Sequence, residues 1–266
     1  MGAATNLKPP KVYGDPNVYK FIQNNIGAFV NIAGDVFWVD LVNGVAGQDG
    51  SWQQPTNAVQ TAHGFCTAGN GDAVFVKNFS GTPNAVENLL WTKRDVSLIA
   101  GVPTGNAMKL TIAPTTGIAL DLQAGSQAAF FYGVRFQGTS GVGVKIGVDG
   151  PRFVECDFYS DTTHGASFVA SGVTNGSGSG AMFEGCEFAD CGGSGIMNNK
   201  GAGAALGLQA TNVIVRGSRF YRNTNGDISD DAGTGSPTYF YQWLVEYNAF
   251  MDTSKTTFLD MKGGLA

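Results

Sequence analysis

The stretch RFVECDF, residues 152–158, decides the fold, because altered copies of it recur along the chain. The five copies are FFYGVRF (130–136), RFVECDF (152–158), MFEGCEF (182–188), IVRGSRF (214–220) and LVEYNAF (244–250). Their final phenylalanines follow one another at intervals of 22, 30, 32 and 30 residues. This interval fits one coil of a β-solenoid with loops of variable length, so each copy is predicted to form one coil.

The columns of the aligned copies support this prediction, because stacked coils place equivalent side chains above one another. Five residues before the shared phenylalanine stands Phe or Val, and two residues before it stand Val134, Cys156, Cys186, Ser218 and Asn248. We expect both columns, and the phenylalanines themselves, to point inward. The column directly before the phenylalanine, Arg135, Asp157, Glu187, Arg219 and Ala249, is predicted to point to solvent.

The two inward columns are three residues apart, whereas side chains on one face of an uninterrupted strand are an even number apart. The chain must therefore turn a corner between the columns. Gly133, Gly185 and Gly217 occupy this corner in three of the five copies. Glycine is favoured there because its backbone adopts conformations that other residues avoid.

Upstream of the repeat, the pattern predicts a short capping helix within residues 55–66, with Ala58, Val59, Ala62, Phe65 and Cys66 on one face and Pro55 near its start. Further strands are predicted within residues 35–42, 71–81, 94–103, 141–148 and 165–173. Residues 1–45 lie outside the repeat and are interpreted as an extended N-terminal arm, with the boundary near Asn43. Residues 46–266 are predicted to form the solenoid domain.

Composition excludes several classes of protein. Glycine supplies 39 of 266 residues and charged residues only 14%, which disfavours a coiled coil. The net charge of −5 and the lack of a basic run argue against nucleic acid as a partner. The longest apolar stretches, such as residues 128–132, are too short to span a bilayer, and the first residues lack the apolar core of an export signal. We therefore expect no membrane partner and no export by the usual route.

The sequence resembles the pectate-lyase-like right-handed parallel β-helix superfamily over residues 46–260. The residues that carry the resemblance are Asp49-Gly50-Ser51, the helix that follows Pro55, the Gly71-Asp72 strand, the strand at residues 96–101 and the repeated Cys/Ser-x-Phe coils. The order of helix, Gly-Asp strand and Val-x-Leu-Ile-x-Gly strand is similar to that of many bacteriophage tailspikes and other virion proteins. The resemblance implies an all-β right-handed parallel β-helix, a fold shared by lyases, glycosidases and proteins that only bind.

Two arrangements of charged residues are candidate catalytic centres. Asp157 and Glu187 fall on adjacent coils, at about the 5 Å separation of a retaining glycosidase. The same column continues into Arg135 and Arg219, so each carboxylate has a basic neighbour and a surface charge ladder is favoured. Lyases of the superfamily combine acidic residues that hold calcium with a basic residue. Here Arg152 and Arg216 stand near Glu155 and Glu184 without an acidic triplet on consecutive coils.

Neither a metal nor a cofactor is expected. Asp227, Asp230 and Asp231 do not follow the spacing of a calcium loop and are interpreted as a solvated turn. The four cysteines lack zinc-binding spacing and are expected to be reduced thiols, Cys156 and Cys186 among them in an inward column. His164 has no adjacent nucleophile that would complete a catalytic triad and is interpreted as a loop residue.

These observations predict a non-enzymatic structural protein of a bacteriophage virion, foremost a capsid decoration or cement protein. The alternative is a tailspike or fibre protein that binds or depolymerises a host surface polysaccharide, and a glycan-binding module without turnover is the third reading. The arm carries the candidate partner-binding residues Tyr13, Tyr19 and Phe21, which would contact a major capsid or tail protein. By resemblance to phage β-helix proteins, we expect a homotrimer.

Overall fold

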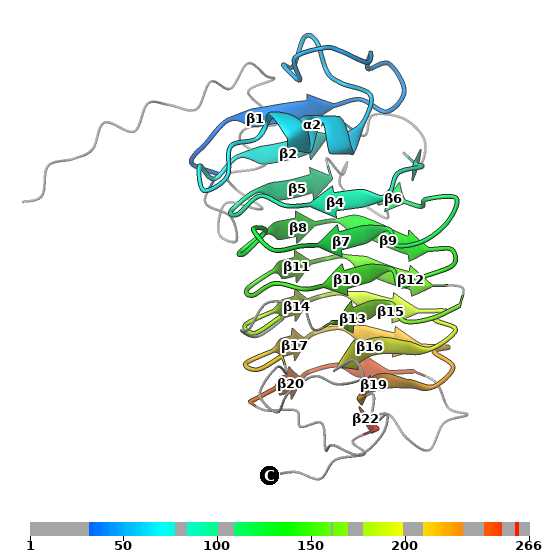
Figure 1. The fold of residues 1–266 in the computed structure, drawn as a ribbon. Coiled ribbons are helices and arrows are strands. Elements are labelled where there is room, and N and C mark those ends of the chain that lie inside the picture. The colour runs from blue at the N-terminus through cyan, green and yellow to red at the C-terminus, as the bar shows by residue number, and fades with distance from the viewer. Residues whose placement is uncertain are drawn as a thin grey trace, which may run out of the picture.

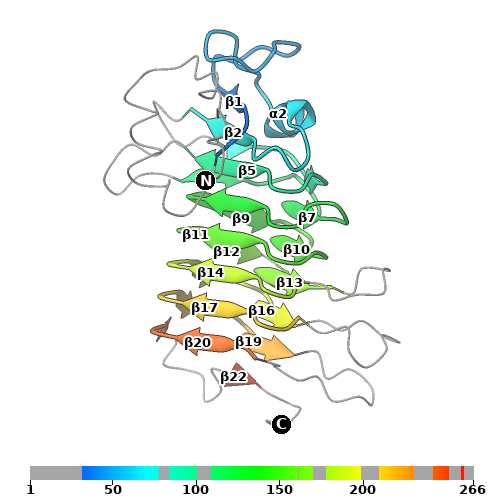
Figure 2. The same ribbon diagram turned by 90° about the vertical axis from the view of Figure 1, so that its left-hand side faces the viewer.

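Three parallel β-sheets run along one axis and make a solenoid, with a short helix near its N-terminal end (Figures 1 and 2). The computed structural model describes residues 32–77, 84–100, 109–160, 162–169, 178–198, 210–230, 242–251 and 259–260. Seven coils can be followed in these residues, each contributing one strand to every sheet, and the first sheet has an eighth strand at its N-terminal end. The predicted all-β parallel β-helix is confirmed.

The sheets consist of strands with the following bounds. The first sheet contains β1 (Val36–Val39), β2 (Ala73–Val76), β5 (Ser97–Ala100), β8 (Phe130–Tyr132), β11 (Arg152–Val154), β14 (Met182–Glu184), β17 (Ile214–Arg216) and β20 (Leu244–Glu246). The second contains β3 (Asn84–Ala85), β6 (Leu110–Ile112), β9 (Val134–Gly138), β12 (Asp157–Ser160), β15 (Glu187–Ala189), β18 (Arg219–Tyr221) and β21 (Ala249–Phe250). The third contains β4 (Leu89–Trp91), β7 (Leu120–Leu122), β10 (Val144–Ile146), β13 (Ala166–Phe168), β16 (Ser194–Asn198), β19 (Gly226–Asp230) and β22 (Leu259–Asp260).

Neighbouring strands pair so that equivalent residues of the sequence repeat lie side by side. Phe158 pairs with Phe136 on one side and with Phe188 on the other, and Phe220 pairs with Phe250 in the last coil. The first four of the shared phenylalanines are fully buried, and Phe250 packs half-buried against the core. The predicted inward columns are therefore confirmed.

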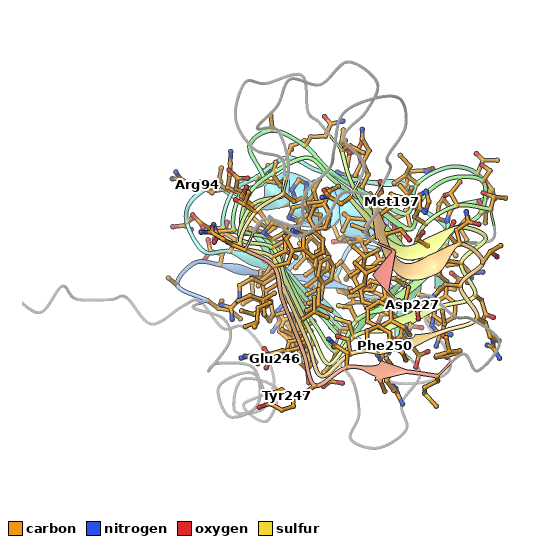
Figure 3. All side chains as sticks on the ribbon, turned by 90° about the horizontal axis from the view of Figure 1, so that it is seen from below. Arg94, Met197, Asp227, Glu246, Tyr247 and Phe250 are labelled. Carbon is orange, nitrogen blue, oxygen red and sulfur yellow. The ribbon has the colours of Figure 1, made fainter. Side chains whose placement is uncertain are left out.

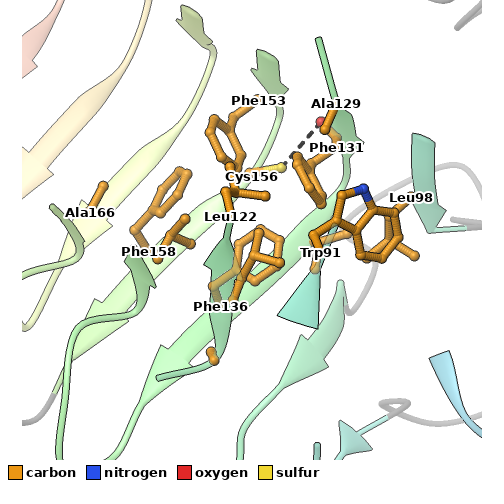
Figure 4. Packing of buried hydrophobic residues seen from close by; sticks show 14 of the residues in the cluster. Trp91, Leu98, Leu122, Ala129, Phe131, Phe136, Phe153, Cys156, Phe158 and Ala166 are labelled. Atoms are coloured by element: carbon orange, nitrogen blue, oxygen red, sulfur yellow. Dashed lines mark hydrogen bonds between the residues drawn. The ribbon is translucent and has the colours of Figure 1, made fainter. Parts of the chain in front are cut away.

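Buried aromatic rings stack along the interior of the solenoid (Figure 4). The ring of Phe188 lies between those of Phe158 and Phe220, at centroid distances of 4.5 and 4.8 Å and interplanar angles of 8° and 7°. A second stack joins Phe153 to Phe131 and Phe183 at 5.0 and 5.2 Å. Because the strand spacing of about 4.8 Å matches a comfortable ring-to-ring distance, phenylalanines at equivalent positions of successive coils can stack directly on one another.

The corner between the first and second sheets has left-handed backbone in all five repeat copies. The φ angle is +65° at Gly133, +62° at Gly185 and +59° at Gly217, as the glycines predict. It is also +54° at Glu155 and at Tyr247, where a side chain is present. The corner is therefore imposed by stacking on neighbouring coils, because this conformation is unfavourable for a residue with a Cβ atom.

A second left-handed corner lies two residues before each first-sheet strand from β2 onward. Its members are Gly71, Asp95, Ala128, Gly150, Gly180, Asn212 and Gln242. Only three of the seven are glycines, so this corner leaves a weak signal in the sequence. In the five repeat copies, one left-handed corner thus precedes the first-sheet strand and one follows it.

The N-terminal end of the solenoid is closed by β1 and by α2 (Val59–Phe65), which contacts β1, β2 and β4 (Figure 1). β1 pairs in parallel with β2 as the outermost strand of the first sheet. The solenoid therefore begins by Val36, before the boundary expected at residue 45. The apolar sequence of residues 36–39 supplies the reason, because it continues the apolar columns of the first sheet.

Charged side chains from the next coil hold both ends of α2. The Glu87 carboxylate accepts the N–H groups of Val59 and Gln60, at 3.0 and 2.9 Å. The Lys93 ammonium donates to the carbonyls of His63, Gly64 and Cys66, at 2.6–2.9 Å. An anion at the N-terminus and a cation at the C-terminus both favour the helix, although α2 has no capping side chain of its own.

The buried face of α2 differs in two residues from the predicted face. Val59, Ala62 and Cys66 are buried as expected, but Phe65 is 39% exposed and His63 is 2% exposed. The ring of His63 stacks on Trp91 with centroids 4.1 Å apart. The ring of Phe65, the last residue of α2, instead lies 5.8 Å from that of Phe37 in β1.

All four cysteines are buried thiols. Burial raises the pKa of Cys66, Cys156 and Cys191 to about 12 and that of Cys186 well above its ordinary value. Thiols with raised pKa values are poor nucleophiles, so these residues act as small core side chains.

Among the described residues, no helix is long and apolar enough to cross a membrane.

Candidate functional site on the outer face of the second sheet

The outer face of the second sheet carries the charged column that the sequence singled out. Arg135 of β9, Asp157 of β12, Glu187 of β15 and Arg219 of β18 pair in register on four successive coils. Arg135 bonds Asp157 at 3.1 Å, and Arg219 lies 3.1 Å from Glu187. The prediction that each carboxylate has a basic neighbour is confirmed.

Asp157 is more enclosed than a solvent-facing residue. Its side chain is only 4% exposed, although it points away from the core, because Lys109 and Arg135 cover it. Lys109 binds one carboxylate oxygen and the Arg135 guanidinium binds the other through two N–H groups, at 3.1 and 3.2 Å. The expectation that this position points freely to solvent is wrong for Asp157, because a lysine from two coils earlier in the stack reaches over it.

Glu187 receives three partners. One carboxylate oxygen accepts the hydroxyl groups of Tyr159 and Tyr221, at 2.5 and 2.6 Å, and the other oxygen faces Arg219. Tyr159 and Tyr221 stand two coils apart, on either side of Ala189. The glutamate therefore joins three consecutive coils through its hydrogen bonds.

These partners fix the protonation of Glu187. Burial alone would raise its pKa, but the hydroxyl groups of Tyr159 and Tyr221 and the charge of Arg219 outweigh it and lower the pKa below the ordinary value. Burial and the bond to Glu187 raise the pKa of Tyr159. A glycosidase acid needs a carboxyl group whose pKa is raised so that it carries a proton near neutral pH, and Glu187 is shifted the opposite way.

The aromatic faces at this site already have partners. The Arg135 guanidinium lies 4.8 Å from the ring centroid of Tyr159, and that of Arg222 lies 4.8 Å from the ring centroid of Tyr221. Arg222 also forms a two-point ion pair with Asp190, at 2.6 Å for both bonds. One face of each tyrosine ring is therefore occupied by a guanidinium group.

The basic and acidic residues considered for lyase chemistry lie on the first sheet and its corner. Arg216 pairs with Glu184 at 2.9 Å, and Glu155 stands at the left-handed corner. An N–H group of Arg152 approaches the Met182 sulfur at 3.8 Å. The structure thus joins Arg216 to Glu184 on the first sheet and places Glu155 at the corner that follows β11.

Asp227 does not lie in the solvated turn predicted for it, whereas His164 lies in a loop as predicted. Asp227 belongs to β19 and is fully buried, with its carboxylate accepting a hydrogen bond from Asn223 at 2.8 Å, so the solvated turn predicted there is wrong. His164 lies in the loop before β13, and its Nδ1 atom accepts the N–H of Ser194 at 2.9 Å. Figure 3 shows Asp227 from the C-terminal end of the solenoid. In the described parts of the chain, no three His, Cys, Asp or Glu residues cluster as metal ligands would.

Several partners in this site were missed by the sequence analysis. Lys109 is 48 residues from Asp157, so only the three-dimensional fold could pair them. Tyr159 and Tyr221 each follow a shared phenylalanine directly, and this common position is a signal that the sequence does contain. The candidate partner-binding residues Tyr13, Tyr19 and Phe21, and also Asp231, lie outside the described residues.

The variant Asp157→Asn is expected to lower the free energy of unfolding by about 1–3 kcal/mol, because it removes a charge that two cations enclose. Chemical denaturation of the purified variant measures this change. Asp190→Asn is the matched control, since the Asp190–Arg222 pair is exposed and its loss should leave stability nearly unchanged. Equal losses in the two variants would contradict a structural role specific to the enclosed pair.

A family model described as a right handed beta helix region matches residues 116–263, which is more than half of the chain. The chain belongs to this right-handed β-helix family. No curated protein sequence matches it.

Solved structures with a similar fold include a virus protein and two polysaccharide lyases. ORF18 of Geobacillus virus E2 shows 14% identity and a TM-score of 0.43, over 93% of this chain and 63% of that protein's length. An alginate lyase from Paenibacillus sp. str. FPU-7 shows 11% identity and a TM-score of 0.40, over 72% of each chain. Pectate lyase Pel9A shows 13% identity and a TM-score of 0.35, over 87% of this chain and 81% of that one. The chain spans less than two thirds of the virus protein, and these likenesses concern the fold alone.

Proposed function

We propose that the chain is a non-enzymatic structural protein of a bacteriophage virion, acting as a capsid decoration or cement protein. The observation that carries the non-enzymatic part is the pairing of both outer carboxylates. Asp157 is held by Lys109 and Arg135, and Glu187 by Arg219 and two tyrosine hydroxyl groups. Carboxylates bound in this way stiffen a rod, because each bond joins different coils, and they are poorly suited to donate or accept a proton during hydrolysis.

The virion part of the proposal is supported by the order of the N-terminal elements. The helix after Pro55, the strand that follows Gly71-Asp72 and the strand within residues 96–101 stand in the order that resembles phage virion β-helix proteins. Asp72 supplies a physical reason for part of this motif: its buried carboxylate accepts N–H groups of Asp35 and Thr67 at 2.8 and 2.6 Å. It thereby fixes the start of β1 next to β2.

In this proposal the protein is a homotrimer made in the host cytoplasm, and its arm contacts a major capsid or tail protein through Tyr13, Tyr19 and Phe21. Such aromatic side chains are common anchors at interfaces. The solenoid then projects from the particle as a stiff rod.

Labelled antibody against the solenoid tests the proposal on intact phage particles, and sedimentation of the purified protein tests the trimer. We expect label on the capsid surface and a mass three times that of the chain. Label at the tail tip, together with binding to host surface glycans, would favour a tailspike or fibre instead. Absence of the protein from purified particles would overturn the virion role, and a monodisperse monomer would overturn the trimer.

A further inference from the structure

The outer face of the first sheet changes character along the solenoid. One outward column runs through Phe75, Ile99, Tyr132 and Val154, and then continues on the following coils as Glu184, Arg216 and Glu246. The outward residues of the earlier coils form an apolar cluster separate from the core, consisting of Trp38, Ala73, Phe75, Ile99, Phe130 and Val154. In this column the change from apolar to charged residues falls between Val154 of β11 and Glu184 of β14; Figures 1 and 2 show where these two strands lie in the solenoid.

The apolar half of this face is protected from water. Ile99 is 0%, Phe75 3% and Val154 3% exposed, although all three point away from the core. On the later coils the same face is open, with Leu244 47% exposed. An outward side chain on a sheet loses its contact with water only if another group lies over it. The apolar half is therefore a covered surface, which we call the first-sheet apolar face.

The described residues that pack against this face point to the segment that covers it. Trp52 packs edge-on against Trp38 at 4.6 Å and covers the end near β1. Ile32, the first described residue of the chain, also packs against the cluster. The residues before Ile32 are therefore joined to the described chain at the apolar face.

The preceding ten residues, IQNNIGAFVN (22–31), have the composition expected of a segment that packs on an apolar surface. They include Ile22, Ile26, Phe29 and Val30 and no charged residue. Extended, ten residues reach about 33 Å, whereas the four strand spacings from β1 to β11 amount to about 19 Å. The segment is long enough to cross the whole face.

We propose that residues 22–31 dock on the first-sheet apolar face, with their apolar side chains against Phe75, Ile99 and Val154. Burial of apolar area on both sides favours this contact, and the uncharged amide side chains of the segment can remain toward solvent. The docking is independent of the virion role. It leaves residues 1–21, with Tyr13, Tyr19 and Phe21, available for a partner.

A photo-crosslinking residue, p-benzoylphenylalanine, placed at position 29 of the full-length protein tests the docking. We expect crosslinks within one chain to residues of β2, β5 or β11, identified by mass spectrometry. The same probe at position 13, nine residues before the docked segment, is the matched control and should not give them. Crosslinks from position 29 to a second copy alone, or to none of these strands, would overturn the proposal.

Two truncations give an independent readout that does not need phage particles. Removal of residues 2–21 should leave binding of the dye ANS unchanged, whereas removal of residues 2–31 should raise it severalfold, because the apolar face is uncovered. A synthetic peptide of residues 22–31 should reverse that rise. In the full-length protein, Ile99→Asp should abolish the crosslink from position 29, and Ile214→Asp, on the open part of the same face, should preserve it. Equal dye binding by the two truncated proteins would contradict the docking.

Discussion

Phe188→Ala is expected to lower the free energy of unfolding by about 3–5 kcal/mol, the range for truncating a buried phenylalanine. Phe188 is fully buried, and its ring is stacked between Phe158 and Phe220. Neighbouring rings cannot move into the cavity, because the strand register fixes each of them to its own coil. Chemical denaturation followed by circular dichroism measures the loss.

The matched control for this change is Phe65→Ala. Phe65 belongs to α2 and is 39% exposed, so its truncation removes less buried area and should cost much less. If the two variants proved equally stable, the phenylalanine stack would not be the core that holds the coils together.

Acidification from pH 7 to pH 4 is expected to lower the free energy of unfolding by about 3 kcal/mol through the protonation of His63 alone. Burial, with the positive charge of Lys93 as a second cause, lowers the pKa of His63 from 6.5 to about 4. Its Nε2 atom is buried without a hydrogen-bond partner among the described residues, and its Nδ1 atom lies 3.4 Å from the Gln60 amide nitrogen. The folded protein therefore favours neutral imidazole.

The direction of the effect follows from this lowered pKa. Between pH 6.5 and pH 4 the unfolded chain binds a proton that the folded protein does not, so stability falls as the pH falls through this window. Above pH 6.5 and below pH 4, His63 adds no further dependence. The stabilisation is present at neutral pH and is lost in acid.

Comparison of variants isolates this contribution from that of the carboxylates. His63→Phe keeps a ring against Trp91 without a titrating group, so the stability difference between pH 7 and pH 4 should shrink by about 3 kcal/mol. His164→Gln, which replaces the other histidine of the chain, should leave the difference unchanged. An unchanged difference in His63→Phe would show that His63 is not enclosed as described.

The sequence predicts the coils well because their strongest determinants repeat. A buried phenylalanine recurs at a fixed position, and three of the five first corners carry glycine. Stacking then propagates the register to copies with weaker signals, such as Glu155 and Tyr247 at the same corner. The second corner was not foreseen, because four of its seven residues are not glycine and nothing local marks them.

The candidate site was only half predictable. The ladder from Arg135 to Arg219 could be read from the repeat, since its members occupy one column. The enclosure of Asp157 by Lys109 could not, because that lysine precedes β6 and lies outside the five aligned copies. Asp227 was misassigned because a polar composition suggests a turn, whereas its partner Asn223 allows a buried position in β19.

Incubation of the purified protein with a panel of bacterial surface polysaccharides tests the central claim most directly, that the paired outer carboxylates stabilise the solenoid and do not cleave glycans. New reducing ends report hydrolysis, and the absorbance of unsaturated products reports lyase cleavage. We predict no product from the native protein and none from Glu187→Gln, which should instead be less stable. Product formed by the native protein and lost in a folded Glu187→Gln variant would contradict the account.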